Sequence, residues 1–156
     1  MNILIPSTYY PSFTDGEIVP IDSSDDEAYW RFWRDVWKRQ RTVIVVEHDV
    51  VPATIALRSL WSCPIGWCTQ PYTYDRMSHY RGLGCVKFTS NIMGIYPDLW
   101  EWIAEKSDYD HPPKHWCRLS ANLTEMLTSL GVTRHDHFMA ARHPIREGSA
   151  HGCNQI

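Results

Sequence analysis

The chain of 156 residues is long enough for one domain with a sizeable core and short for two. Hydrophobic residues make up 44% and charged residues 21%, which is ordinary globular composition, and the formal net charge of −3 gives no electrostatic reason to expect a nucleic-acid partner. No apolar run approaches the roughly 20 residues that cross a bilayer, so no membrane span is expected.

The N-terminal part is predicted to contain two short extended segments and a helix. Residues 2–6 indicate a buried strand and lack the basic and long apolar regions of a signal peptide, which favours a cytoplasmic location with reduced thiols. Residues 16–21 form the second extended segment. Ser24 and Glu27 have the spacing of a capping box, so the helix is expected to begin there and to end near Arg41.

The predicted helix carries an apolar stripe. Trp30, Trp33 and Trp37 recur at helical spacing. Tryptophans in such a pattern can bind flat ligands or sugars, but packing in a core is the commoner arrangement. We therefore expect the stripe to face the core.

A β-branched run, residues 42–46, follows the helix and predicts a strand buried on both faces, as in a parallel sheet. Pro52 is then predicted to open a helix through Trp61. The order strand, helix, strand, helix favours an α/β layered fold. No repeat or linker interrupts the chain, so we expect a single small domain over residues 1–156, with residues 134–156 as a His-rich C-terminal tail.

The second half is less regular. Residues 63–72 predict an irregular loop, and residues 82–84 predict a turn before a strand over residues 85–89. Pro97 and Asp98 begin a short helix with apolar Leu99, Trp102 and Ile103. Pro112 and Pro113 open a longer helix that ends near Gly131, with an apolar face made of Trp116, Leu119, Leu123, Met126, Leu127 and Leu130.

Acidic residues follow the central strand directly. Ligands of open α/β sheets bind outside the carboxyl ends of the strands. Because side chains alternate along a strand, Glu47 and Asp49 are expected to project together while His48 points away. Two carboxylates so placed suit Mn²⁺ or Mg²⁺, which prefer oxygen ligands. The alternative is that these acids are merely solvated where the chain leaves the sheet.

Residues 45–49 (Val-Val-Glu-His-Asp) resemble the D-x-D element of GT-A-type glycosyltransferases, with Glu in the first acidic position. Residues 71–72 and 82–89 resemble the segments on the acceptor side. The resemblance implies a Rossmann-like, mostly parallel GT-A-type sheet flanked by helices, a nucleotide-sugar donor, an unknown acceptor and metal binding by Glu47 and Asp49. Such families often add a His near the C-terminus, for which His135, His137 and His143 are candidates and His143 is favoured.

The resemblance leaves two parts of the site open. Only 46 residues precede Glu47, fewer than such enzymes normally use. Either residues 5–13 recognise the nucleotide through Thr8, Tyr9 and Tyr10, or the domain is a reduced one with altered donor binding. An inverting transferase also needs a carboxylate base near the acceptor hydroxyl, for which Asp98 and Glu101 are candidates. A retaining mechanism would not need them, and acids in a first helical turn usually serve the helix dipole.

Cysteine and histidine offer a second interpretation. Cys63 and Cys68 have a spacing seen in zinc sites, and the set could be completed by His111, His115 or Cys117. Such a site would make the chain a non-catalytic, zinc-stabilised binding module with its aromatic residues as the contact surface. No cysteine lies in a recognisable nucleophile motif, and no Gly-rich phosphate loop is present.

Overall fold

A central six-stranded sheet organises the structure. The computed structural model describes residues 1–73, 79–80, 82–106, 112–138 and 141–142. In the central sheet five strands run in the same direction, and β8 is antiparallel to both of its neighbours. The mostly parallel sheet expected from the sequence is confirmed. In spatial order the strands are β2 (Glu17–Pro20), β1 (Ile3–Ser7), β3 (Val43–Val46), β8 (Cys85–Phe88), β5 (Trp67–Thr69) and β9 (His135–Asp136).

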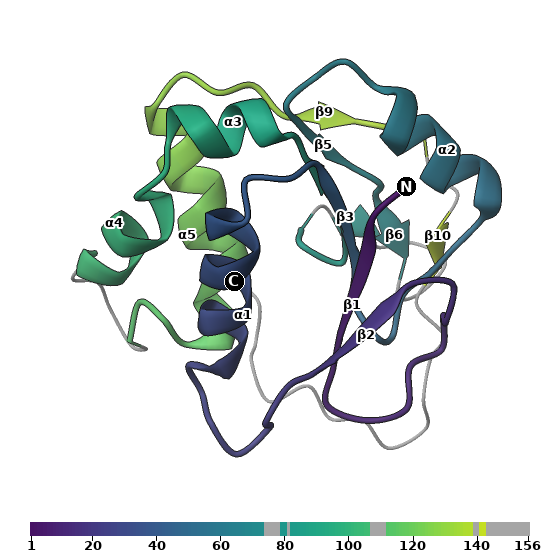
Figure 1. The fold of residues 1–156 in the computed structure, drawn as a ribbon, viewed down its shortest axis with the longest axis horizontal. Helices are drawn as coiled ribbons and strands as arrows, with labels where there is room; N and C mark the ends of the chain where they lie inside the picture. Colours follow the sequence, from purple (N-terminus) through teal and green to yellow (C-terminus); the bar gives the residue numbers. More distant parts are fainter. Residues whose placement is uncertain (74–78, 81, 107–111, 139–140, 143–156) are drawn as a thin grey trace.

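Helices cover both faces of this sheet (Figure 1). One face is covered by α1 (Ala28–Lys38), α3 (Ser90–Ile95), α4 (Leu99–Glu105) and α5 (Trp116–Ser129). The other face is covered by α2 (Thr54–Ser62). A small second sheet has the order β4 (Val51–Pro52), β10 (Ala141–Arg142), β6 (Tyr72–Thr73) and β7 (His79–Tyr80). The fold is thus a single α/β domain.

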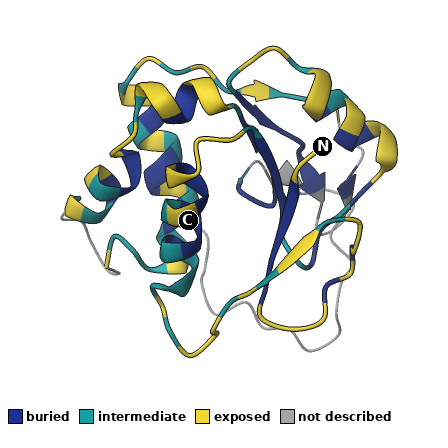
Figure 2. Ribbon diagram, in the orientation of Figure 1, coloured by how far each residue is buried: buried dark blue, intermediate teal, exposed yellow. Residues whose placement is uncertain are grey.

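Strand alternation divides the core into two halves. The halves are separated because successive side chains along a strand point to opposite faces of the sheet. Leu4, Val45 and Phe88 join the α1 side, whereas Ile5 and Ile44 join the α2 side. Strands β1 and β3 are buried along their length (Figure 2), which agrees with the β-branched composition of β3.

The tryptophan stripe of α1 lies in the core, as expected. Trp33 is fully buried and stacks on Trp100 of α4, with ring centroids 5.8 Å apart. The indole N–H of Trp30 donates to the carbonyl oxygen of Trp100 at 3.0 Å, and that of Trp37 donates to Tyr96 at 2.7 Å. The stripe therefore joins α1 to the α3–α4 segment and is not an open platform.

The predicted capping box is wrong. Helix α1 begins at Ala28, and no side chain caps its N-terminus. The hydroxyl of Ser24 donates to Asp22 Oδ1 at 2.6 Å, and Asp25 Oδ1 accepts from the backbone N–H of Glu27 at 2.9 Å. These local side-chain bonds hold residues 22–27 in turns, because Asp and Ser side chains compete with the helix for backbone groups.

Several other boundaries differ from the sequence prediction. The segment expected to be an irregular loop contains strand β5, and α3 was not foreseen. Pro52 pairs within β4, and α2 starts at Thr54. Trp102 and Trp116, which the sequence analysis grouped with the apolar residues of α4 and α5, are 37% and 46% exposed, whereas Leu99, Ile103, Leu119, Leu123 and Leu127 are buried. No helix in the described part of the chain is long and apolar enough to cross a bilayer.

Candidate functional site

The carboxyl ends of β1 and β3 meet at one edge of the central sheet. The strands are parallel neighbours, with Ile3 opposite Ile44. The loop after β1 folds against the residues after β3: the N–H of Ser12 donates to the carbonyl oxygen of His48 at 2.7 Å. The rings of Tyr9 and His48 meet edge to face, with centroids 4.2 Å apart. The loops after β1 and β3 thus form one surface, which we call the strand-end surface. It lies where α/β folds bind ligands.

The acids after β3 lie in a turn and not in an extension of the strand. Strand β3 ends at Val46, and the N–H of Val50 donates to the carbonyl oxygen of Glu47 at 3.0 Å. The strand alternation expected to project Glu47 and Asp49 together therefore does not apply, because it ends one residue earlier. Asp49 is 9% exposed and Glu47 is partly buried.

Glu47 is fixed from two sides. Its backbone N–H donates to the carbonyl oxygen of Gly84 at 2.9 Å, and its Oε1 accepts from the hydroxyl of Tyr29 at 2.7 Å. Burial of the phenol and the charge of Glu47 raise the pKa of Tyr29 well above its usual value. The hydroxyl therefore stays protonated and donates to the carboxylate. The sequence offered no signal for this contact, since Tyr29 and Glu47 belong to different elements.

Strand β8 begins beside the same turn. A Cβ atom on Gly84 would lie 2.4 Å from Cε1 of Tyr72, closer than any real contact, so glycine allows the Tyr72 ring to lie against the backbone. Burial and the nearby charge of Glu47 raise the pKa of Cys85 to about 12. Cys85 is thus a buried thiol at neutral pH and lacks the thiolate that a nucleophile requires.

The other predicted site residues fall in different places. Tyr9 and Tyr10 are 42% and 80% exposed on the β1 loop, and Thr8 is exposed beside them. Glu101 pairs with Lys38 at 3.6 Å, at the last residue of α1. Tyr29 lies near the first residue of that helix, so the structure does not bring Glu101 to the turn after β3.

Asp98 precedes the first residue of α4, and its side chain makes no capping hydrogen bond. It belongs to the same helix start as Glu101 and not to the strand-end surface. His143 lies outside the described residues.

His135 and His137 lie with Cys63 and Cys68. One ligand atom from each of the four residues falls within 4.8 Å of all the others. The zinc partners proposed from sequence differ: His115 caps α5 by accepting from the N–H of Cys117. Cys117 forms a disulfide, so the expectation of reduced thiols is wrong for this residue. His111 lies outside the described residues. The sequence could not place His135 and His137 beside these cysteines, because the pairing of β5 with β9 brings them together.

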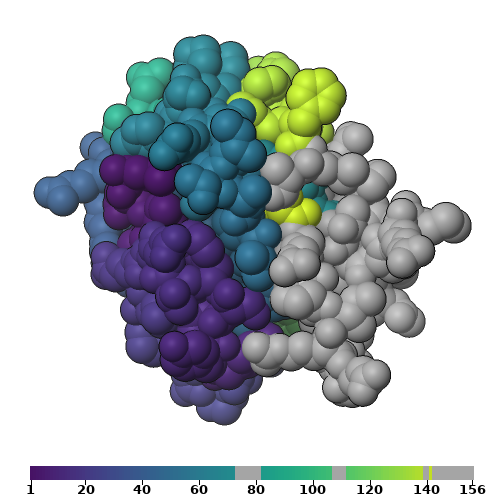
Figure 3. All heavy atoms as spheres, turned by 90° about the vertical axis from the view of Figure 1, so that its right-hand side faces the viewer, coloured from purple at the N-terminus to yellow at the C-terminus, as the bar shows by residue number. Residues whose placement is uncertain are grey.

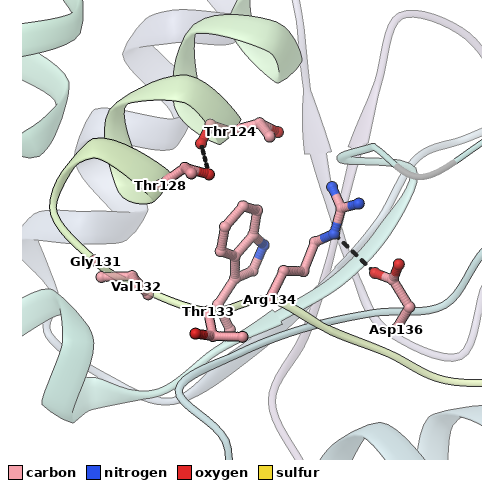
Figure 4. Close-up of a pocket in the computed structure, with 8 residues that line it drawn as sticks. Thr124, Thr128, Gly131, Val132, Thr133, Arg134 and Asp136 are labelled. Carbon is pink, nitrogen blue, oxygen red and sulfur yellow. Dashed lines mark hydrogen bonds and ion pairs between the residues drawn. The ribbon is translucent and has the colours of Figure 1, made fainter.

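A shallow pocket of about 370 Å³ opens on the α5 side of the sheet (Figure 4). Thr124 and Thr128 of α5 line one wall, and Arg134 and Asp136, joined at 2.7 Å, line the other. No described residue of the predicted site lines this pocket, so it is separate from the strand-end surface.

Comparison with known proteins supports the fold. No protein-family model and no curated protein sequence matches the chain. Among solved structures, the chain is similar to a glycosyltransferase involved in the glycosylation of the major capsid of PBCV-1, with 10% identity and a TM-score of 0.52 over 93% of this chain and 94% of that one. It is also similar to A197 from STIV, with 14% identity and a TM-score of 0.53 over 94% of this chain and 87% of that one. The chain has a GT-A-like, Rossmann-type fold.

Proposed function

We propose that the protein is a metal-dependent glycosyltransferase that transfers a sugar from a nucleoside-diphosphate donor to an acceptor. The observation that carries the proposal is the turn after β3, where the buried carboxylate of Asp49 and the held carboxylate of Glu47 lie at the ligand-binding edge of the sheet. A similar fold in a glycosyltransferase, covering nearly all of both chains, supports it.

The residues present fit Mn²⁺ or Mg²⁺. Glu47 and Asp49 supply oxygen ligands of the kind these ions prefer, and one of them is already oriented by a hydrogen bond, as metal-binding carboxylates usually are. When bound, the ion supplies Lewis-acid stabilisation of the diphosphate that leaves the sugar. The protein's own part is to hold the two carboxylates and to orient the donor.

The β1 loop is the proposed nucleotide-binding element. Tyr9 packs on His48 beside the acids and still exposes 42% of its surface, so its ring is available to a flat base. Thr8 and Tyr10 lie on either side of it and offer hydroxyl groups to the ribose. We give Asp98 and Glu101 no role in transfer, because Glu101 pairs with Lys38 at the remote end of α1.

A screen of nucleotide sugars tests the proposal. The free energy of unfolding should rise by about 2.7 kcal/mol at a ligand concentration of 100 Kd. For a domain of this size that corresponds to a rise in Tm of roughly 5–10 °C. The rise should require Mn²⁺ together with a sugar nucleotide and should exceed that with Mn²⁺ alone. If no nucleoside diphosphate or sugar nucleotide raises the Tm beyond Mn²⁺ alone, the proposed donor class is wrong.

The zinc-stabilised module remains a second candidate, because the Cys63–Cys68–His135–His137 cluster offers zinc ligands. The two interpretations are separable. A module that binds no nucleotide sugar in the screen but retains zinc would favour the second one.

A further inference from the structure

Four potential metal ligands converge on the α2 side of the sheet edge, away from the strand-end acids. Cys68 in β5 pairs directly with His135 in β9, and paired residues project to the same face. His137, two residues further, returns to that face. Cys63 follows the last residue of α2, the helix that covers this face of the sheet, and joins the same cluster. Three separate elements thus supply the cluster.

The contacts within the cluster are close. The Sγ atoms of Cys63 and Cys68 are 3.0 Å apart, and Cys63 Sγ is 3.1 Å from Nδ1 of His135. The rings of His135 and His137 have centroids 4.5 Å apart. With zinc–sulfur bonds of about 2.3 Å, a tetrahedral site separates its sulfur atoms by about 3.8 Å. The two sulfur atoms would therefore have to separate by about 0.8 Å to admit the ion.

His137 is oriented as a metal-binding histidine. Its Nδ1 lies 2.7 Å from the hydroxyl of Ser59 in α2. Its Nε2 is buried and has no hydrogen-bond partner in the described part of the chain. A proton on Nδ1, donated to Ser59, leaves the Nε2 lone pair available for a metal. A second hydrogen bond of this kind is the usual companion of a ligating imidazole.

A buried lysine lies against the cluster. Lys87 is buried beneath the cluster and donates from Nζ to the carbonyl oxygen of Cys63.

We propose that Cys63, Cys68, His135 and His137 bind one zinc ion in a closed, structural site. Two sulfur and two nitrogen ligands select zinc over Mn²⁺ and Mg²⁺, which prefer oxygen. All four positions come from the protein, so no position is left for a substrate, and the site is distinct from the strand-end acids. The inference does not depend on the proposed transferase activity.

The position of the proposed zinc site indicates that the ion would hold strand β9 in place. Strand β9 has two residues and lies at the edge of the sheet, where few backbone bonds hold it. Zinc would tie β9 to α2 and β5. The chain then continues to β10, which pairs with β4 directly after the Asp49 turn. In Figure 3 the yellow-green segment that includes β9 lies against the blue-teal surface that includes α2. The metal would therefore anchor the segment that leads back to the strand-end surface.

The test begins with metal content. The full chain, purified under reducing conditions, should retain one zinc per molecule by elemental analysis. Co²⁺ in its place should give the absorption bands of a tetrahedral thiolate site. Cys63→Ser and His135→Gln, which replace one sulfur and one nitrogen ligand, should lose the retained zinc and these bands. His115→Gln is the matched control outside the cluster and should keep both.

A further variant separates metal binding from folding. Ser59→Ala leaves all four ligands in place but removes the hydrogen bond that orients His137. It should remain folded and bind zinc about 10–100-fold more weakly. The proposal is overturned if reduced wild-type protein binds neither zinc nor Co²⁺, if Cys63 and Cys68 form a disulfide and bind no metal after reduction, or if the two ligand variants retain zinc like the control.

Discussion

Asp49 occupies a turn whose two ends are both anchored. On one side strand β3 is buried throughout, and on the other Val50 is fully buried in the α2-side core. A carboxylate in such a turn has little freedom to move, which is what a metal ligand requires. At the scale of single residues, the site therefore depends on backbone placement by core neighbours, and on Tyr29 as the residue that orients Glu47.

Tyr29→Phe tests the orienting role. The substitution removes the hydroxyl that donates to Glu47 and keeps the ring, which stacks on Phe32 with centroids 5.9 Å apart. Donor affinity in the presence of Mn²⁺ should fall by about 10–100-fold, as for other groups that orient metal ligands. The free energy of unfolding should fall by about 0.5–1.5 kcal/mol. Titration calorimetry and urea unfolding measure the two effects.

Tyr96→Phe is the matched control, because its hydroxyl donates to Leu130 at 3.4 Å on the helical side of the fold. This variant should bind the donor like wild type. Equal affinities in both variants would show that Tyr29 does not act on the site.

Helix α1 is the element that carries most of the aromatic core. Trp33 contacts Phe32, Phe88 and Trp100 through ring packing. Trp33→Ala should lower the free energy of unfolding by about 3–5 kcal/mol, as for other large-to-small aromatic changes in cores. Asp35→Ala, on the exposed side of the same helix, should change it by less than about 0.5 kcal/mol. A stable Trp33→Ala protein that loses only ligand binding would mean that the stripe is a binding surface.

The start of β8 is a second element whose role depends on one residue. Gly84→Ala places a Cβ against the buried Tyr72 ring and should destabilise the fold by about 1–3 kcal/mol. Gly94→Ala in helix α3 meets no atom within 4 Å and should stabilise it by about 0.5–1 kcal/mol. Thermal unfolding of both variants measures whether each is less or more stable than wild type. A stable Gly84→Ala protein would show that Tyr72 moves freely.

Local patterns predicted the strongly buried elements well. The β-branched run of β3 and the tryptophan spacing of α1 are visible in the local sequence, although the residues that cover them are distant in the chain. Strand β5 escaped prediction because its three residues, Trp67–Thr69, have no length over which to show a pattern. The partners of Cys63 also escaped it, because the register that places His135 beside Cys68 is set between distant segments. Glu47 and Asp49 follow β3 as the sequence predicts, but the sequence did not predict the turn in which they lie.

At the scale of the whole molecule, the two faces of the sheet carry different groups of residues. The α1 side holds the aromatic core, and the α2 side holds the Cys/His cluster. The strand-end surface lies between them, built from the loops after β1 and β3. This division predicts that the proposed metal binding at the strand end and the proposed zinc site at the sheet edge can be removed independently, by Asp49→Asn and Cys63→Ser respectively.

The most direct test is calorimetric titration of wild-type protein and Asp49→Asn with the nucleotide sugar that raises the Tm most, with and without Mn²⁺. Asp35→Asn, an exposed acid on α1, is the control, and circular dichroism confirms that all three proteins are folded. Wild type and Asp35→Asn should bind the nucleotide sugar only when Mn²⁺ is present. Asp49→Asn should lose more than about tenfold in affinity, or 1.4 kcal/mol. Binding that is equal in all three proteins, or that needs no metal, would contradict the proposed site.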